Sequence, residues 1–208
     1  MMLKKLKFIL VFISLSICLG LMSTTYSRYV AAANGNVDTL FARWQILINE
    51  NDITNGTSST ISFQPEIDAN TNVANAKIAP SSTGHFDIEI NPTNVDVSFK
   101  YDIQLGIENE TMPDLMITKY AIIPDGYIVG DPIEFINLVD GKITNTLTYD
   151  NNTQDFSFKP FTVRVYFEWY DGVDNVMTDI DDTAAGNDAA VNGTTFKMNA
   201  TINFEQVI

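Results

Sequence analysis

Residues 95–107 read VDVSFKYDIQLGI and decide the fold class. Every odd position from Val95 to Ile107 carries a bulky apolar side chain, and every even position is polar or small. A helix would scatter the apolar set around its circumference, whereas an extended strand places the two sets on opposite faces. The stretch therefore predicts one long strand with a buried and an exposed face.

The same period of two recurs along the chain, at 42–48, 86–90, 161–169 and 196–204. Residues 115–123 and 143–149 are weaker strand candidates, and residues 133–140 are predicted to form a short helical turn. We find no helical period of ten or more residues after Met22. Turn-forming pairs separate the segments: Asn55-Gly56, Asn91-Pro92, Asp125-Gly126, Asp140-Gly141, Asp171-Gly172 and Asn192-Gly193.

Seven or more half-apolar strands need a second layer to bury their apolar faces. The sequence therefore predicts an all-β fold, a single antiparallel β-sandwich of jelly-roll-like form over residues 41–208. The strand aromatics Trp44, Phe161, Phe167 and Trp169 are assigned to its core.

Composition limits the function. The chain has 208 residues, 45% of them hydrophobic, and a net charge of −14. Nucleic-acid binding is excluded as a function, because phosphate affinity depends on Lys and Arg. A single histidine, His85, and a single cysteine, Cys18, leave little for metal or nucleophilic catalysis. We read His85 as an exposed strand residue and the protein as a non-enzyme; carboxylate-based hydrolysis is a third, weaker reading.

The N-terminus has the organisation of a secretory signal peptide, assigned to residues 1–27. Lys4, Lys5 and Lys7 precede an apolar run over 8–22, and small residues follow. The small pair Thr25 and Ser27 predicts cleavage after Ser27. Two alternatives are cleavage after Ala33 and an uncleaved anchor. Before cleavage this segment is the only expected membrane contact.

The exported chain would be strongly acidic and free of cysteine. Residues 1–27 hold three of the twelve basic residues and no acid, which leaves nine basic and 26 acidic residues, a net charge of −17. Such a domain cannot use disulfides, so its packed core must hold it together. Residues 28–40 are predicted to form a flexible N-terminal arm, since they include the run Ala31-Ala32-Ala33-Asn34-Gly35-Asn36.

Three segments resemble the TasA/camelysin family of Gram-positive bacteria: 24–29 (TTYSRY), 42–49 (ARWQILIN) and 77–90 (KIAPSSTGHFDIEI). The resemblance covers about residues 20–107 and implies a secreted jelly-roll protein processed by a SipW-type signal peptidase. It also implies self-association into biofilm-matrix fibres, in which the arm 28–40 adds as a strand to the next subunit. The start Arg28-Tyr29-Val30 departs from the short acidic start of the fibre formers.

The acidic run 171–188 is the candidate cation site. It contains no basic residue, and Asp179, Asp181 and Asp182 are the calcium-ligand candidates, because hard cations bind clustered carboxylates on flexible loops. A solvated acidic loop is the alternative reading. Tyr166 and Tyr170 share the outer face of one strand and are candidates for a glycan platform.

The leading functional expectation is a secreted structural protein of the cell surface or extracellular matrix, which forms biofilm fibres by N-terminal strand donation. The alternative is a monomeric, surface-displayed module that binds glycan or calcium.

Overall fold

The computed structural model describes residues 7, 9–18, 40–54, 61–107 and 112–207. The chain divides into two compact units, Met1–Phe41 and Ala42–Ile208. In the first unit, residues 9–18 are helical. Among the described residues, no helix has both the length and the apolar character needed to cross a membrane. The predicted cleavage residues Thr25 and Ser27 and most of the arm lie outside the described residues.

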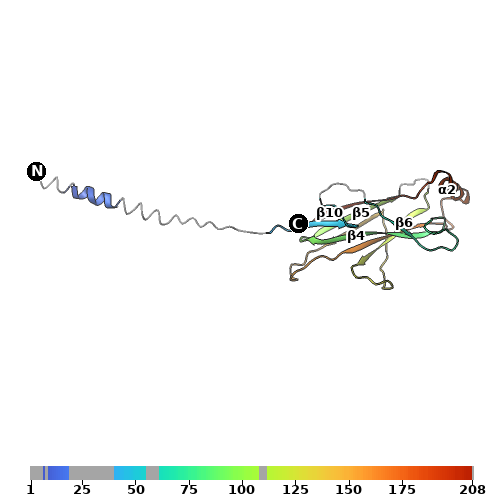
Figure 1. Ribbon diagram of the computed structural model, residues 1–208, viewed down its shortest axis with the longest axis horizontal. Coiled ribbons are helices and arrows are strands. Elements are labelled where there is room, and N and C mark those ends of the chain that lie inside the picture. The colour runs from blue at the N-terminus through green and yellow to red at the C-terminus, as the bar shows by residue number, and fades with distance from the viewer. Residues whose placement is uncertain (1–6, 8, 19–39, 55–60, 108–111, 208) are drawn as a thin grey trace. The chain divides into compact units, whose positions relative to one another are not determined.

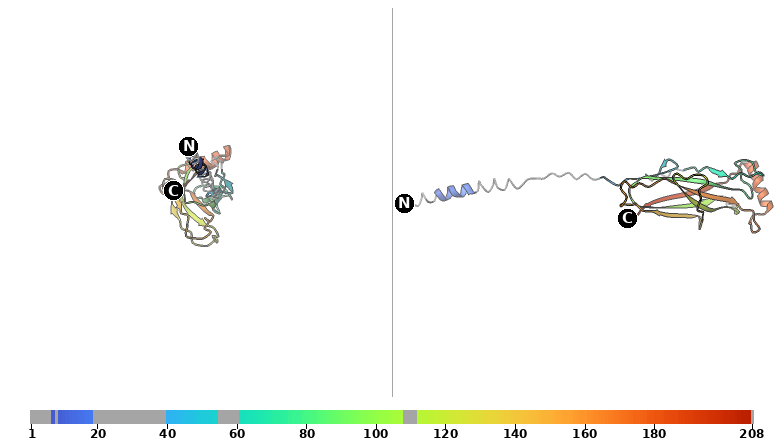
Figure 2. Two further views of the ribbon diagram at one scale, coloured as in Figure 1. Left: turned by 90° about the vertical axis from the view of Figure 1, so that its left-hand side faces the viewer. Right: turned by 90° about the horizontal axis from the view of Figure 1, so that it is seen from below.

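Two antiparallel sheets form the second unit (Figures 1 and 2). The larger sheet contains β1 (Trp44–Ile48), β2 (Asn51–Asp52), β3 (Pro65–Ile67), β4 (Thr83–Val95), β6 (Leu115–Pro124), β7 (Ile136–Asn137) and β9 (Phe161–Trp169). Its order is β2-β1-β4-β9-β6-β7, and β3 also pairs with β4. The smaller sheet has the order β10-β5-β8 and contains β5 (Phe99–Ile107), β8 (Lys142–Leu147) and β10 (Met198–Gln206). The prediction of a two-sheet antiparallel fold is confirmed.

The segment 95–107 is not one strand, as its alternation predicted. Strand β4 ends at Val95, β5 begins at Phe99, and residues 96–98 carry the chain from the larger sheet to the smaller one. The alternation survives this crossing because Val95, Phe99 and Tyr101 all remain fully buried between the sheets. Periodicity reports which side faces the core, and that side does not change at a sandwich corner. We call residues 96–98 the β4–β5 corner.

The core lies between the two sheets and consists of the inward set of each strand. Its largest fully buried side chains are Tyr101, Phe99 and Phe167. Aliphatic residues of β1, β4, β5, β8 and β9 fill the space around them: Ile46, Ile48, Ile88, Ile90, Val95, Ile103, Ile143, Val163 and Val165. Alternation in the sequence therefore identified which side of these strands faces the core.

Residues Asn91-Pro92, predicted to be a turn, lie inside β4. The register between β1 and β4 shifts here, because Gln45 pairs with Asn94 but Leu47 pairs with Asn91. One residue of β1 thus faces two of β4, which is a β-bulge. Proline occurs within sheets at such bulges because it cannot donate a ladder hydrogen bond.

A helix that the sequence pattern did not predict, α2 (Asp179–Asn192), lies between β9 and β10. No residue of α2 is buried, so it has no apolar stripe for periodicity to detect. Its ends are specified locally instead: Thr178 and Asp181 form a capping box, and Gly193 ends the helix with a φ of 68°. The helical turn predicted at 133–140 is wrong, since this segment contains strand β7.

Candidate binding groove

An open groove of about 950 Å³ runs between the edges of the two sheets. Strands β1 and β3 pair with different parts of β4 on the edge that β9 leaves free, so they lie end to end along one side of the groove. Strand β10 forms the other side. The apolar lining on the first side consists of Trp44, Ile46, Ile48 and Phe86 from β1 and β4, and of Ile53, Ile61 and Phe63 from the connection between β2 and β3.

Strand β10 is a sheet edge along its whole length. Nine residues, Met198–Gln206, pair with β5, and no strand in the described part of the chain pairs with the other edge of β10. Its core-facing residues are Met198, Ala200, Ile202 and Phe204, and all four are only partly buried. An unpaired edge above an apolar groove exposes backbone donors and acceptors together with apolar surface.

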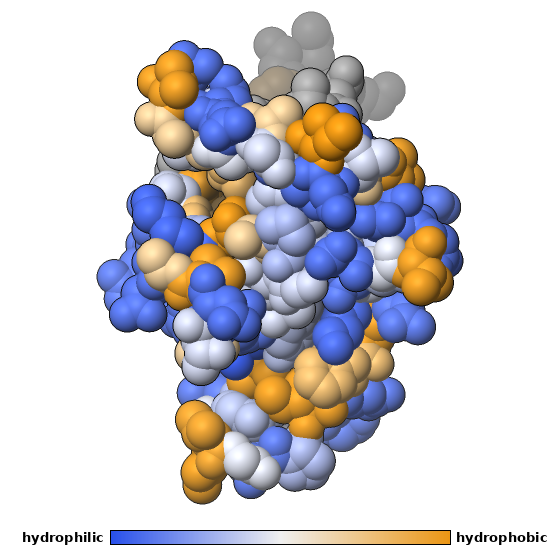
Figure 3. All heavy atoms as spheres, turned by 90° about the vertical axis from the view of Figure 1, so that its right-hand side faces the viewer, coloured by the Kyte–Doolittle hydropathy of each residue, from blue (hydrophilic) through white to orange (hydrophobic). Residues whose placement is uncertain are grey.

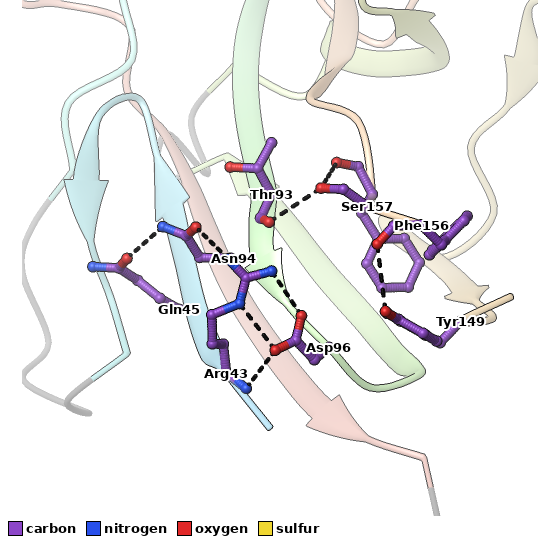
Figure 4. Close-up of polar contacts among 9 residues, drawn as sticks. Arg43, Gln45, Thr93, Asn94, Asp96, Tyr149, Phe156 and Ser157 are labelled. Carbon is purple, nitrogen blue, oxygen red and sulfur yellow. Dashed lines mark hydrogen bonds and ion pairs between the residues drawn. The ribbon is translucent and has the colours of Figure 1, made fainter. Parts of the chain in front are cut away.

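The end of the groove at the β4–β5 corner is fixed by Arg43, the residue before β1 (Figure 4). The Arg43 guanidinium donates to both carboxylate oxygens of Asp96, with Nε to Oδ2 at 2.9 Å and Nη2 to Oδ1 at 2.8 Å. The Arg43 backbone N–H also donates to Asp96 at 2.9 Å, and Asp96 N–H donates to the Arg43 carbonyl at 3.0 Å. Gln45 adds a side-chain bond from Asn94 at 2.8 Å. These contacts hold Arg43 against the β4–β5 corner.

The contacts between Arg43 and Asp96, which clamp Arg43 at the corner, predict that the domain loses stability in acid. Hydrogen bonds from Arg43 lower the pKa of Asp96 from 3.8 to about 2. Because the folded-state pKa lies below the unfolded one, the unfolded chain binds more protons between these values, and the stabilisation is lost as the pH falls from about 4 to 2. We expect Asp96→Asn to lower the melting temperature at neutral pH. On acidification, the melting temperature of the variant should fall less than that of the wild type.

A melting-temperature series from pH 7 to pH 2 on the two proteins checks this. Some acid sensitivity will remain in Asp96→Asn, because Lys100 and Thr144 lower the pKa of Asp102 to about 2 as well. Parallel curves for the two proteins would contradict the assignment to Asp96.

His85 is not the exposed residue that its position on a polar face predicted. Its side chain is only 15% exposed, because its ring lies 5.7 Å from the Tyr166 ring at a tilt of 40° and its Nε2 lies 3.4 Å from the Glu66 carboxylate on β3. The sequence missed this because β3 covers His85 only in the folded sheet. The histidine therefore packs β3 against β4, and Glu66 is the charged group that this packing places beside it.

The proposed glycan-platform residues have neighbours of their own. Tyr166 meets Phe135 edge-on at 5.3 Å, and the Lys119 ammonium lies 4.5 Å from the centre of the Phe135 ring and 5.5 Å from that of Tyr166. The hydroxyl of Tyr170 lies 3.5 Å from the Asp174 carboxylate. Tyr166 is thus partly covered, and Phe135 is the more exposed aromatic of this face.

The three calcium candidates lie in the first turn of α2, so the prediction of a flexible loop here is wrong. Asp181 accepts bonds from the Thr178 N–H and hydroxyl at 2.8 and 2.7 Å, which lower its pKa. Burial raises the pKa of Asp182, which packs toward Trp169. Within the described residues, no group of three or more His, Cys, Asp or Glu side chains is arranged to hold a metal ion. Calcium binding stays a prediction.

Asp114 is a buried carboxylate that sequence reasoning missed. It accepts the backbone N–H groups of Val176 and Met177 at 2.8 and 2.5 Å, and its carbonyl accepts the Tyr170 N–H at 2.7 Å. It therefore anchors the loop between β9 and α2 to the start of β6. Only the folded chain brings these residues together, so no sequence signal identifies them.

Trp44, which was assigned to the core, packs against the core cluster but is only half-buried, because it also lines the groove. Phe161 is also half-buried, whereas Phe167 and Trp169 are buried as predicted. The sequence does not distinguish a core position from a groove position, because both carry the same apolar alternation.

No protein-family model matches the chain, and no curated protein matches it either. The fold and the groove define the class of the molecule: a two-sheet antiparallel β-protein with an unpaired edge strand beside an apolar groove.

Proposed function

We propose that this chain is a secreted structural protein of the bacterial cell surface or extracellular matrix, without enzymatic activity, which assembles into fibres of the biofilm type by strand donation. In this proposal a SipW-type signal peptidase releases residues 1–27, the two sheets adopt a jelly-roll plan, and the arm 28–40 of one copy adds to the next. The N-terminal organisation and the family resemblance support export. The observation that carries the assembly is the groove beside β10.

An added strand fits the chemistry of this groove. The free edge of β10 offers backbone hydrogen bonds over nine residues, and the groove accepts the apolar side chains of every second residue of a strand. The segment 29–37 has this pattern in its second half. Its odd positions, Tyr29, Ala31, Ala33, Gly35 and Val37, are apolar or small; of its even positions, Asn34 and Asn36 are polar, whereas Val30 and Ala32 are apolar. The length of this segment matches that of β10.

Chain length favours donation between copies. Every strand pair of the described chain is antiparallel. Because β10 runs toward the β4–β5 corner, a strand that adds antiparallel to β10 runs away from that corner. Residue 37 then lies beside Met198, ~30 Å from the corner at about 3.3 Å per residue. Arg43 of the same copy is clamped at that corner, and the six residues 38–43 reach at most ~20 Å. The arm therefore cannot pair in this sense with its own β10.

Deletion of the arm tests the proposal. Chains 28–208 and 41–208 are purified and compared by light scattering and electron microscopy over a range of concentration, salt and pH. We expect filaments or large oligomers from 28–208 only, and more of them at high salt or low pH, since both reduce the repulsion between acidic copies. N-terminal sequencing of the exported protein identifies its start.

A chain 28–208 that stays monomeric under all these conditions would contradict fibre formation. Saturable binding of a glycan or of calcium by that monomer, unchanged by deletion of the arm, would favour the ligand-binding alternative instead. The control for folding is the melting temperature of 41–208, which should stay close to that of 28–208 because the core cluster lies in residues 46–167.

A further inference from the structure

The strand-donation geometry determines which ends of two copies meet, and the inference below rests on the proposed function. An arm that pairs antiparallel with β10 leaves the groove beside Met198, at the end of the sandwich opposite the β4–β5 corner. Its own body is clamped at Arg43, only six residues further along the chain, within ~20 Å. The corner end of the donor must therefore face the end of the acceptor that carries α2.

That end of the acceptor exposes apolar side chains that the described part of the chain leaves largely uncovered. We call Val173, Val176, Ile180 and Val191 the α2 pole; these residues are 104%, 72%, 80% and 82% exposed. Ile180 and Val191 are eleven residues apart, which is close to three turns, so they lie on one side of α2. Ala185, on another side of the helix, packs toward Leu115, Trp169 and Met177. Figure 3 looks onto this end and shows hydrophobic residues among hydrophilic ones.

The connector that would cross this end also contains large apolar residues. Residues 38–43 read DTLFAR, and Leu40 and Phe41 are 96% and 94% exposed. Adjacent exposed Leu and Phe side chains are costly in water unless something covers them. They lie three and four residues beyond Val37, so they emerge from the acceptor's groove close to the α2 pole.

We propose that the α2 pole of one copy binds Leu40 and Phe41 of the next copy. The partner is a second copy of this chain, and the contact is apolar. It joins the open end of the groove to the outer side of α2. The interface is therefore heterologous, the kind that repeats head to tail and builds a filament when successive rotations do not close a ring.

The α2 pole lies in an acidic stretch of the chain, so we expect the strength of the contact between copies to depend on salt. The same stretch of chain contains Asp171, Asp174, Asp179, Asp181, Asp182 and Asp188, and no basic residue occurs between Arg164 and Lys197. The connector adds Asp38, and Arg43 is already engaged by Asp96. Approach of the two copies is therefore electrostatically unfavourable, and salt should strengthen the contact by screening.

Two fluorescent peptides separate this contact from the groove itself. Peptide 28–37 carries the strand alone, and peptide 28–41 adds the connector with Leu40 and Phe41. Each is titrated into the chain beginning at Arg28, at concentrations below its assembly threshold, and followed by fluorescence anisotropy. We expect peptide 28–41 to bind about tenfold more tightly, because two large apolar side chains become covered.

The double variant Ile180→Asp/Val191→Asp should remove this difference and leave the binding of peptide 28–37 unchanged. Val139→Asp, which also replaces an exposed valine but in the turn before β8, is the matched control and should keep the tenfold difference. Equal affinity of the two peptides for the wild type would overturn the α2-pole contact but would leave the proposed binding of the arm in the groove intact. Failure of both peptides to bind would overturn the proposed function and this inference together.

Discussion

Phe99→Ala is expected to lower the free energy of unfolding by about 3–5 kcal/mol, the range for deletion of a buried aromatic ring. Phe99 is fully buried at the start of β5, directly after the β4–β5 corner. Its ring meets Phe158 at 5.1 Å, Phe204 of β10 at 6.1 Å and Trp44 of β1 at 6.3 Å. The ring therefore supports both sides of the groove, and its loss should loosen β10 as well as the core.

Urea denaturation measures this effect, because a shift of the midpoint with an unchanged slope isolates stability. The matched control is Phe135→Ala, which removes a half-exposed ring on the outer face of the larger sheet and should cost less than about 1 kcal/mol. Losses of similar size for the two variants would show that Phe99 is not central to the packing between the sheets. A single domain has about 5–15 kcal/mol of stability, so Phe99→Ala should remove a large part of it.

Asp114→Ala is expected to lower the free energy of unfolding by about 2–4 kcal/mol. The substitution leaves the N–H groups of Val176 and Met177 without their acceptor. The Met177 N–H is buried, and an unsatisfied buried donor costs about 1–3 kcal/mol, whereas the Val176 N–H is only partly buried and adds less. Met177 is itself buried against Leu115 and Trp169, so the loop that precedes α2 should detach with it. Because that loop carries Val173 and Val176, the variant should also lose the tighter binding of peptide 28–41.

Hydrogen exchange of residues 170–178, together with urea denaturation, checks this prediction. Asp174→Ala removes an exposed carboxylate from the same loop and is the control, with an expected change within about 0.5 kcal/mol. If Asp114→Ala behaves like Asp174→Ala, the carboxylate does not anchor the loop.

Periodicity predicted the strands well because it reports burial on one face. Strand β9 has the predicted bounds, Phe161–Trp169, and β1, β6, β8 and β10 begin or end within a few residues of theirs. It failed at the β4–β5 corner, where the chain passes from one sheet to the other while the same side stays buried. It also failed at α2, because no face of this helix is buried. Pro92 was misread as a turn because its bulge depends on the register with β1.

The sequence by itself determined that the chain is extended, alternating and acidic, with a core that needs two layers, since these properties depend on each residue and its near neighbours. The tertiary structure alone decided that β10 has a free edge, that Trp44 faces a groove, that Glu66 covers His85 and that Asp114 holds a distant loop. Each of these joins segments far apart in the chain. Strand order and register, which local patterns do not encode, place such segments beside one another.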